Sequence, residues 1–295
     1  LKTYFAKHAW GNTTLQDLLT ELEATSGRDL KPWVALWLQT SGVNTLRPQL
    51  TVEDGKYTSV AVAQEAPLVP EGSTDLRPHR MAIGLYDKVG SKIVLRKRVE
   101  LDISGALTPV PQLAGEKVAD LLLINDGDLS YGKVRFDEAS VATLKSSLGL
   151  IEDDLTRALA WSAMWDMTRD GELSASDYVT TVINGLAGEP DAAVINMQFG
   201  QLYTAVELYA SDSHRSSLRT QVADGLFRLL DSSAPGSDLQ LQYVRGSAMF
   251  AAEPHQIARV RAVLNGEVSG VTVDANLRWH LLNSIVERGA ATIEE

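Results

Sequence analysis

Residues 121–148 read LLLINDGDLSYGKVRFDEASVATLKSSL, and the spacing of the apolar side chains changes within them. Leu121–Ile124 is a continuous apolar run, as in a strand that is buried on both faces. Asn125–Asp128 follows with the composition of a tight turn. From about Glu138 the apolar residues recur every three or four positions, which is the period of a helix with one buried face. This stretch therefore predicts the point at which a β-rich part of the chain gives way to a helical part.

The residues before this point, roughly 45–136, carry the pattern of short strands. Apolar side chains alternate with small ones along Met81–Leu85 and with charged ones along Val99–Ile103. Proline and glycine are frequent between such runs, as expected for turns. Several short strands separated by turns are typical of a sandwich of two antiparallel sheets. We therefore expect an antiparallel β-sandwich in this part of the chain.

The residues after this point predict helices and no strands. Loop-forming residues such as Asp170-Gly171 separate the helices, and short links favour antiparallel neighbours. Because no strand pattern intervenes, the apolar faces of the helices must pack on one another. We expect a curved, solenoid-like array of the HEAT or armadillo kind, although no strict sequence repeat is present. The predicted helices are 138–148, 152–168, 174–187, 191–210, 214–231, 237–251, 254–265 and 276–288.

Two further helices are predicted ahead of the sandwich. Asn12–Thr14 offers N-cap oxygens, and the apolar stripe Leu15–Leu22 follows the spacing of one buried helical face. Gly27 suits the position just past the end of that helix. The second helix is expected over residues 29–42, with Pro32 in its first turn, where a missing N–H costs nothing.

The predicted fold class is therefore α+β and multidomain. We expect a helical lead-in over residues 1–45, an antiparallel β-sandwich over 46–136 and an α-helical array over 137–295. Because the chain begins without Met and stops without a C-terminal device, we expect both of its ends to be cuts in a longer polypeptide.

The chain is acidic, with a net charge of −11 and a pI of about 5.0. Such a chain repels phosphate backbones, so we expect no nucleic-acid partner. The one compact basic run, Arg96-Lys97-Arg98, is interpreted as a solvated strand edge, with a phosphate-binding patch as the less favoured alternative. No apolar run reaches the roughly 18 residues of a membrane helix, so no membrane partner is expected. The absence of cysteine fits a reducing compartment, and we expect cytoplasmic localisation.

No residue pattern in the chain points to catalysis. The five histidines include no His-Glu-x-x-His pair, and the closest two, His255 and His280, are 25 positions apart. The acids Glu152–Asp154 are interpreted as the start of a helix, where they complement its dipole. We therefore predict no catalytic, cofactor-binding or metal-ligating residue in this chain.

The tryptophans are interpreted as packing residues. Trp33 and Trp37 stand four positions apart, on one face of a helix, as do Trp161 and Trp165. Trp10 and Trp279 are also expected to pack in the interior.

Four segments, taken in order, resemble aminopeptidase N, a family of gluzincin zinc metallopeptidases, and most closely its actinobacterial branch. The first resembles the end of the family's catalytic domain, the second the end of its β-sandwich, and the last two its C-terminal helical domain. The resemblance covers essentially the whole chain, and its first segment is the most specific. The segments are Phe5–Thr14 with its continuation through Ser26–Leu30 to Gly42–Leu46, then Leu123–Gly132, Trp161–Met167 and Leu277–Leu282.

The resemblance implies a division of labour within a longer parent enzyme. In the family, an upstream domain carries the His-Glu-x-x-His helix, a further glutamate ligand, the Gly-x-Met-Glu-Asn strand and a tyrosine that stabilises the oxyanion. None of these motifs occurs here, so no catalytic or zinc-binding residue is carried over. The parent would hold Zn²⁺ and act on peptides, whereas this part would partner the upstream catalytic domain, wall the active-site cavity and be inactive alone.

Two alternatives remain open from the residues. In the first, the chain is an independent helical-repeat scaffold for protein interactions. In the second, its β-sandwich is a carbohydrate- or protein-binding module. The lead-in discriminates between the readings, because a free-standing scaffold has no reason to carry two helices that end another domain.

Overall fold

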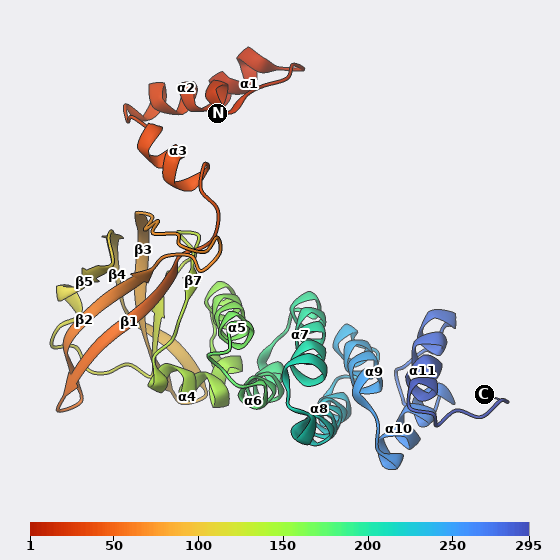
Figure 1. Cartoon of the computed structure of the whole chain (residues 1–295). Helices are drawn as coiled ribbons and strands as arrows, with labels where there is room; N and C mark the ends of the chain where they lie inside the picture. Colours follow the sequence, from red (N-terminus) through yellow and green to blue (C-terminus); the bar gives the residue numbers. More distant parts are fainter. Residues whose placement is uncertain (295) are drawn as a thin grey trace.

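The computed structural model describes residues 1–294, which form three parts in chain order (Figure 1). A small group of helices stands apart from the sheets, two sheets follow, and a row of helices extends away from them (Figure 1). The predicted α+β arrangement of lead-in, sandwich and helical array is confirmed. The lead-in helices are α1 (Lys2–His8), α2 (Leu15–Ser26) and α3 (Lys31–Trp37).

The start and end of α2 follow the predicted capping chemistry. The Thr14 hydroxyl accepts a hydrogen bond from the Asp17 backbone N–H at 3.4 Å, and the Asp17 carboxylate accepts one from the Thr14 N–H at 2.8 Å. This reciprocal pair satisfies backbone donors that the first helical turn leaves free. At the other end Gly27 adopts φ +68°, a left-handed conformation that glycine tolerates best.

The end of α3 differs from the prediction. The helix stops at Trp37 and does not continue to Gly42. Gly42 adopts φ +87° in the loop that follows, and a Cβ atom there would lie 2.3 Å from the carbonyl oxygen of Val69. Glycine is therefore required at this position by a close crossing of two loops, which its sequence context does not reveal.

Two sheets form the predicted sandwich. One has the strand order β5-β2-β1-β7 and the other β4-β3-β6. All pairs are antiparallel except β1 and β7, where Thr45 and Leu46 pair in parallel with Lys133 and Val134, so the expectation of a purely antiparallel sandwich is wrong at this short edge. The strands are β1 (Thr45–Glu53), β2 (Lys56–Glu65), β3 (His79–Val89), β4 (Lys92–Ile103), β5 (Leu107–Pro109), β6 (Leu121–Ile124) and β7 (Lys133–Val134).

Strand β6 is buried on both faces, as its continuous apolar run predicts. It pairs with β3, and helix α4 (Glu138–Ser147) covers its outer side, where the Ser140 hydroxyl accepts a hydrogen bond from the Leu122 N–H at 2.9 Å. All four side chains of Leu121–Ile124 are buried. The helical part therefore begins by packing directly on a sheet.

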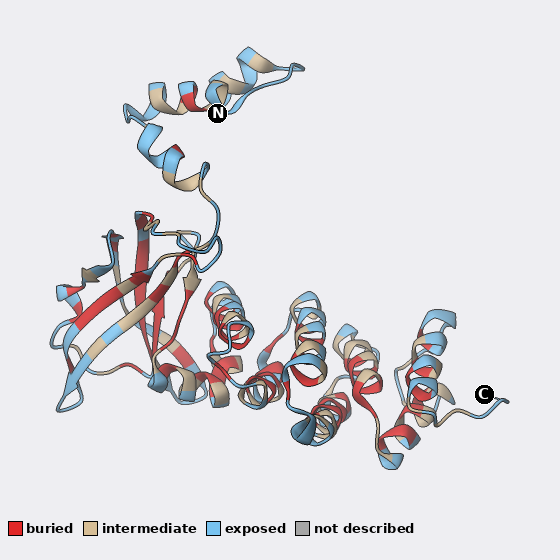
Figure 2. Cartoon of the chain, in the orientation of Figure 1, coloured by how far each residue is buried: buried red, intermediate tan, exposed pale blue. Residues whose placement is uncertain are grey.

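The helical array continues this core. Helices α4, α6, α8 and α10 form one layer of the row, and α5, α7, α9 and α11 form the other (Figure 1). Buried residues face the space between the layers, whereas the lead-in is mostly exposed (Figure 2). Each of the eight predicted helices is present, and α7 closes in a π-helical turn over Ala205–Tyr209. The later helices are α5 (Asp154–Arg169), α6 (Ala175–Gly185), α7 (Ala192–Thr204), α8 (Asp212–Ser232), α9 (Asp238–Phe250), α10 (Pro254–Leu264) and α11 (Ala275–Glu287).

Glycines permit the closest contacts inside the array. Gly149 and Gly188 meet backbone to backbone, because a Cβ atom on Gly188 would lie 2.0 Å from the carbonyl oxygen of Gly149. Gly246 of α9 lies against the ring of Phe199, whose nearest carbon would be 2.6 Å from an added Cβ. Gly200 of α7, by contrast, has no atom within 4 Å of the position that a Cβ would take.

The pair Gly246 and Gly200 gives a matched stability test. We expect Gly246→Ala to lower the free energy of unfolding by about 1–3 kcal/mol, because the added methyl overpacks the core against Phe199. Gly200→Ala should raise it by about 0.5–1 kcal/mol, because alanine favours a helix and meets nothing. Urea unfolding followed by circular dichroism measures both, and equal effects of the two substitutions would contradict the packing described here.

Candidate functional site

The residues that the sequence singled out are distributed over the whole molecule. The histidines lie on α1, β3, α8, α10 and α11, and each of the last four bonds to a nearby group. Within residues 1–294 no three His, Cys, Asp or Glu side chains are grouped so that they could hold a metal ion. In the same residues no helix has both the length and the apolar character needed to cross a bilayer.

The basic run on β4 is fully engaged with acids. Arg96 pairs with Asp87 at 2.7 Å and with Glu116 at 2.9 Å, and Lys97 shares Glu116 at 2.8 Å. Arg98 reaches the acids Glu100 and Asp126. These charges are paired with acids of the strands and of the loops beside them, as the interpretation of a solvated strand edge expects.

The acids at Glu152–Asp154 also take the structural role. Asp153 is the N-cap of α5, and its carboxylate accepts a hydrogen bond from the Thr156 N–H at 2.8 Å. This backbone hydrogen bond lowers the pKa of Asp153.

The strongest polar cluster joins the sandwich to the array. Arg135, only 2% exposed, follows β7 and pairs with Asp170 and, at 2.8 Å, with Glu172, both in the turn after α5. Arg47 of β1 grips Glu172 with two hydrogen bonds of 2.5 and 2.8 Å, and Lys133 pairs with Asp170 at 2.7 Å. We call these five residues the Arg135 clamp.

Three cations around two acids shift the titration of the clamp. Hydrogen bonds from Arg47 lower the pKa of Glu172 to about 2, against the opposing effect of burial, and Arg135 adds to the shift. Burial alone would raise the pKa of Asp170, but hydrogen bonds from Lys133 and Arg135 outweigh it and lower that pKa. Both acids are therefore ionised at neutral pH and hold the two parts of the molecule together.

A second seam lies at the other end of α5. The Tyr86 hydroxyl donates to Asp126 at 2.5 Å and lies 3.0 Å from the Thr156 hydroxyl. Burial, and then the hydrogen bond to Asp126, raise the pKa of Tyr86. Asp126 is also paired with Arg98 at 2.9 Å. Helix α5 is thus fixed to the sheets at both of its ends.

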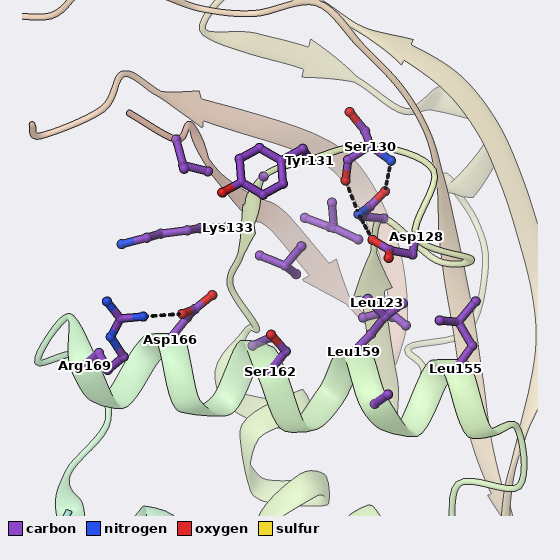
Figure 3. Close-up of a pocket in the computed structure, with 17 residues that line it drawn as sticks. Leu123, Asp128, Ser130, Tyr131, Lys133, Leu155, Leu159, Ser162, Asp166 and Arg169 are labelled. Atoms are coloured by element: carbon purple, nitrogen blue, oxygen red, sulfur yellow. Dashed lines mark hydrogen bonds and ion pairs between the residues drawn. The ribbon is translucent and has the colours of Figure 1, made fainter. Parts of the chain in front are cut away.

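A cavity of about 590 Å³ lies between these two attachments (Figure 3). Leu155, Leu159, Ser162, Asp166 and Arg169 line it along one side of α5, opposite the loop that leads into β7 (Figure 3). Its helical wall therefore runs from an apolar end to a charged end, where burial raises the pKa of Asp166.

The array holds one more buried ion pair. Arg157 of α5 bonds to Glu189 at 3.0 Å, and the Trp161 Nε1–H donates to the same carboxylate at 3.1 Å. Trp161 is fully buried, as predicted, and Trp165 lies beside Tyr178 and Tyr209 with ring centroids 5.1 and 6.0 Å away.

Three other tryptophans contradict the packing interpretation. Trp10 and Trp279 are 106% and 66% exposed, and Trp33 is 41% exposed, so none of the three is an interior residue. Within helices α4–α11 every exposed large apolar side chain lies on α5, on α7 with its π turn, or on α11. These residues are Leu155, Met197, Tyr203, Leu208, Tyr209, Trp279 and Val286.

Comparison with known proteins agrees with this architecture. Residues 121–295 match the family model described as the ERAP1-like C-terminal domain. The chain belongs to this ERAP1-like C-terminal domain family. It is also 44% identical, over 296 aligned residues and 98% of its length, to aminopeptidase N of Streptomyces lividans. The resemblance to aminopeptidase N predicted from the sequence is thereby confirmed.

The ERAP1-like match begins at β6, the last strand of the second sheet, and so includes the point where the apolar period changes. The chain spans about a third of the length of the Streptomyces relative, 34% of it. The Arg135 clamp lies mostly within the matched residues, and only Arg47, on β1, lies outside them. Sequence reasoning missed the clamp, although a charged residue between the apolar Val134 and Phe136 was a signal of it.

The clamp predicts a specific loss of stability in acid. Because the pKa of Glu172 is depressed in the folded chain, its contribution is complete above the ordinary value of 4.5 and is lost as the pH falls toward about 2. Glu172→Gln should lower the free energy of unfolding at pH 7 by about 2–3 kcal/mol. The difference from the unmodified chain should shrink toward zero near pH 2.

The control is Glu152→Gln, which removes the exposed pair between Glu152 and Lys92. This change should alter the free energy of unfolding by less than about 1 kcal/mol at every pH. Urea unfolding between pH 2 and 7 measures both. If the free energy of unfolding of the Glu172→Gln variant differed from that of the unmodified chain by the same amount at every pH, ionisation of Glu172 would not stabilise the Arg135 clamp.

Proposed function

We propose that this chain is the non-catalytic C-terminal part of a zinc-dependent aminopeptidase that removes N-terminal residues from peptides. The identity to aminopeptidase N of Streptomyces lividans over 98% of the chain carries the proposal. That relative is almost three times as long as the matched region, which supports a separate catalytic part elsewhere in the parent. Residues 1–45, 46–136 and 137–295 are the proposed domain divisions.

Zinc chemistry is assigned to the remaining part of the parent. The described residues do not fit a zinc site, because they include no group of three potential metal ligands. The five histidines lie on five different elements, and four of them are hydrogen-bonded to other groups. When bound in the parent, zinc would activate the water that attacks the peptide bond. This chain contributes no step to that chemistry.

The surface of the lead-in supports docking onto the catalytic part. Its three short helices bury little against the rest of the chain (Figure 2), and six large apolar residues of the lead-in are exposed. Large exposed apolar surface is typical of sites that bind another protein part. The exposed apolar residues of the lead-in are Leu1, Phe5, Trp10, Leu15, Trp33 and Leu38.

The one-sided surface of the array supports a role as a cavity wall. Its exposed apolar side chains occur on α5, α7 and α11, which belong to one layer, and aromatic and methionine side chains among them suit contact with polypeptide. A wall of packed helices would admit unfolded peptides and reject folded proteins. The net charge of −11 would attract the positively charged N-termini of peptides. The lack of cysteine supports a cytoplasmic setting.

The alternative is an independent scaffold whose helical array binds other proteins. The exposed lead-in favours the peptidase reading, because a free-standing scaffold gains nothing from exposed helices beside its sheets. Binding of a specific soluble partner in the absence of the catalytic part would favour the scaffold.

Docking is tested by binding to the separately expressed remainder of the parent. We expect a complex, and Phe5→Asp on α1 should weaken it at least about tenfold, because an exposed apolar contact is replaced by a charge that must be desolvated. Val89→Asp, at an equally exposed apolar residue on the β3–β4 hairpin, is the matched control and should leave the affinity unchanged. Isothermal titration calorimetry measures all three.

The chain alone, supplied with zinc, should not hydrolyse an aminoacyl chromogenic substrate. Turnover, or tightly held zinc, would contradict the proposal directly. Equal loss of affinity in both variants would show that the lead-in is not the docking surface.

A further inference from the structure

Three arginines are buried in this molecule, and one of them lacks an acidic partner. Arg77, Arg135 and Arg157 are 3, 2 and 5% exposed. Arg135 pairs with Asp170 and Glu172, and Arg157 pairs with Glu189 and Asp154. Among residues 1–294 the hydrogen-bond partners of Arg77 are carbonyl, amide and hydroxyl oxygens, and no carboxylate is paired with it. An unpaired buried charge is costly, so the exception calls for a physical reason.

Arg77 is surrounded by neutral acceptors at the joint between α3 and the sandwich. Its Nε–H donates to the Leu36 carbonyl at 2.8 Å, and Nη1 donates to the Asn44 side-chain oxygen at 3.0 Å. Nη2 donates to the Thr40 hydroxyl at 2.7 Å and to the Ser41 carbonyl at 3.3 Å. A guanidinium has five N–H donors, so one hydrogen on Nη1 has no acceptor among the described residues.

A small pocket of about 250 Å³ opens at this point. Arg77 lines it together with Trp37, Asn44 and Tyr131, and no acidic residue contributes to its wall. The guanidinium carbon of Arg77 lies 5.6 Å from the centre of the Trp37 ring. The Trp37 indole nitrogen is also buried, and among residues 1–294 it has no acceptor.

The titratable side chain beside this pocket does not balance the positive charge of Arg77. His79 lies beside Trp37, with ring centroids 5.2 Å apart, and its Nδ1 is 2.7 Å from the Ser130 hydroxyl. Burial, and then the charge of Arg77, lower the pKa of His79 to about 4, so this ring is neutral at pH 7. The joint therefore keeps one uncompensated positive charge in a chain whose net charge is −11.

We propose that this pocket is a binding site for a carboxylate group. A carboxylate supplies the negative charge that Arg77 lacks and oxygen acceptors for the free hydrogens of Arg77 and Trp37. The volume is below that of sites for drug-sized ligands, so it suits an acetate-sized group or the end of an Asp or Glu side chain. The proposal is independent of the proposed function, because it rests only on the pocket and its donors.

Nuclear magnetic resonance of the whole chain tests the site directly. The chain has six tryptophans, and Trp37→Phe identifies which indole N–H signal belongs to Trp37. Titration with sodium acetate should move that signal in a saturable way, whereas acetamide and sodium chloride at equal ionic strength should not. The absence of a saturable shift, or the same shift with acetamide, would overturn the proposal.

Variants then separate binding from folding. Trp37→Phe keeps the ring against His79 but removes the donor, so acetate binding, followed at the Val43 backbone amide in the same pocket, should weaken about tenfold. Arg77→Met should abolish saturable binding. Arg80→Met, at an exposed arginine on β3, three positions after Arg77, is the control and should leave binding unchanged. Unchanged acetate affinity in the Trp37→Phe and Arg77→Met variants would overturn the site.

Two peptides distinguish the possible sources of the carboxylate. If the natural occupant is an acidic side chain, acetyl-Gly-Glu-Gly-amide should bind at least as tightly as acetate, and its Gln counterpart should not bind. If the occupant is a small free acid, acetate should bind and the Glu peptide should be excluded. Either result supports a carboxylate site, and failure of both ligands would overturn it.

Discussion

The Arg135 clamp sets how the two sheets meet the helical array. A guanidinium that is almost fully buried is tolerated only because two carboxylates from the turn after α5 meet it there, and removing either acid leaves charge uncompensated. Arg47 and Lys133 bring β1 and the segment of β7 to the same acids. The sheets and the first long helix of the array are therefore joined by charges that are satisfied only in one relative orientation.

The second attachment removes the remaining freedom of α5. Tyr86 and Asp126 hold its start, and the Arg135 clamp holds its end, so the helix cannot pivot on the sheets. Every later helix packs on the one before it, and the direction of the row follows from this first element. The lead-in has no comparable attachment, because Arg77 grips mainly carbonyl and hydroxyl groups at the end of α3.

The sequence predicted the elements that depend on neighbouring residues, but it did not predict contacts and burial that depend on residues far apart in the chain. The change of period after Ile124, the capping of α2 at Thr14 and all eight helices of the array were readable, because each depends on neighbours in the chain. The clamp joins residues at least 35 positions apart, and no local rule pairs them. Trp10 and Trp279 were assigned to the interior from their residue type alone, but burial depends on which surfaces the fold brings together.

The contact between Gly149 and Gly188 has a consequence for precision. Gly149 follows α4 and Gly188 follows α6. Because two main chains in contact have no side-chain rotamers to adjust, the spacing between the ends of these two helices is fixed by atomic radii alone. Small deviations in the packing of each later pair of helices add up along the row, so the position of a helix varies more the farther it lies from this contact. We expect the position of α11, at the far end of the row, to carry the largest accumulated deviation.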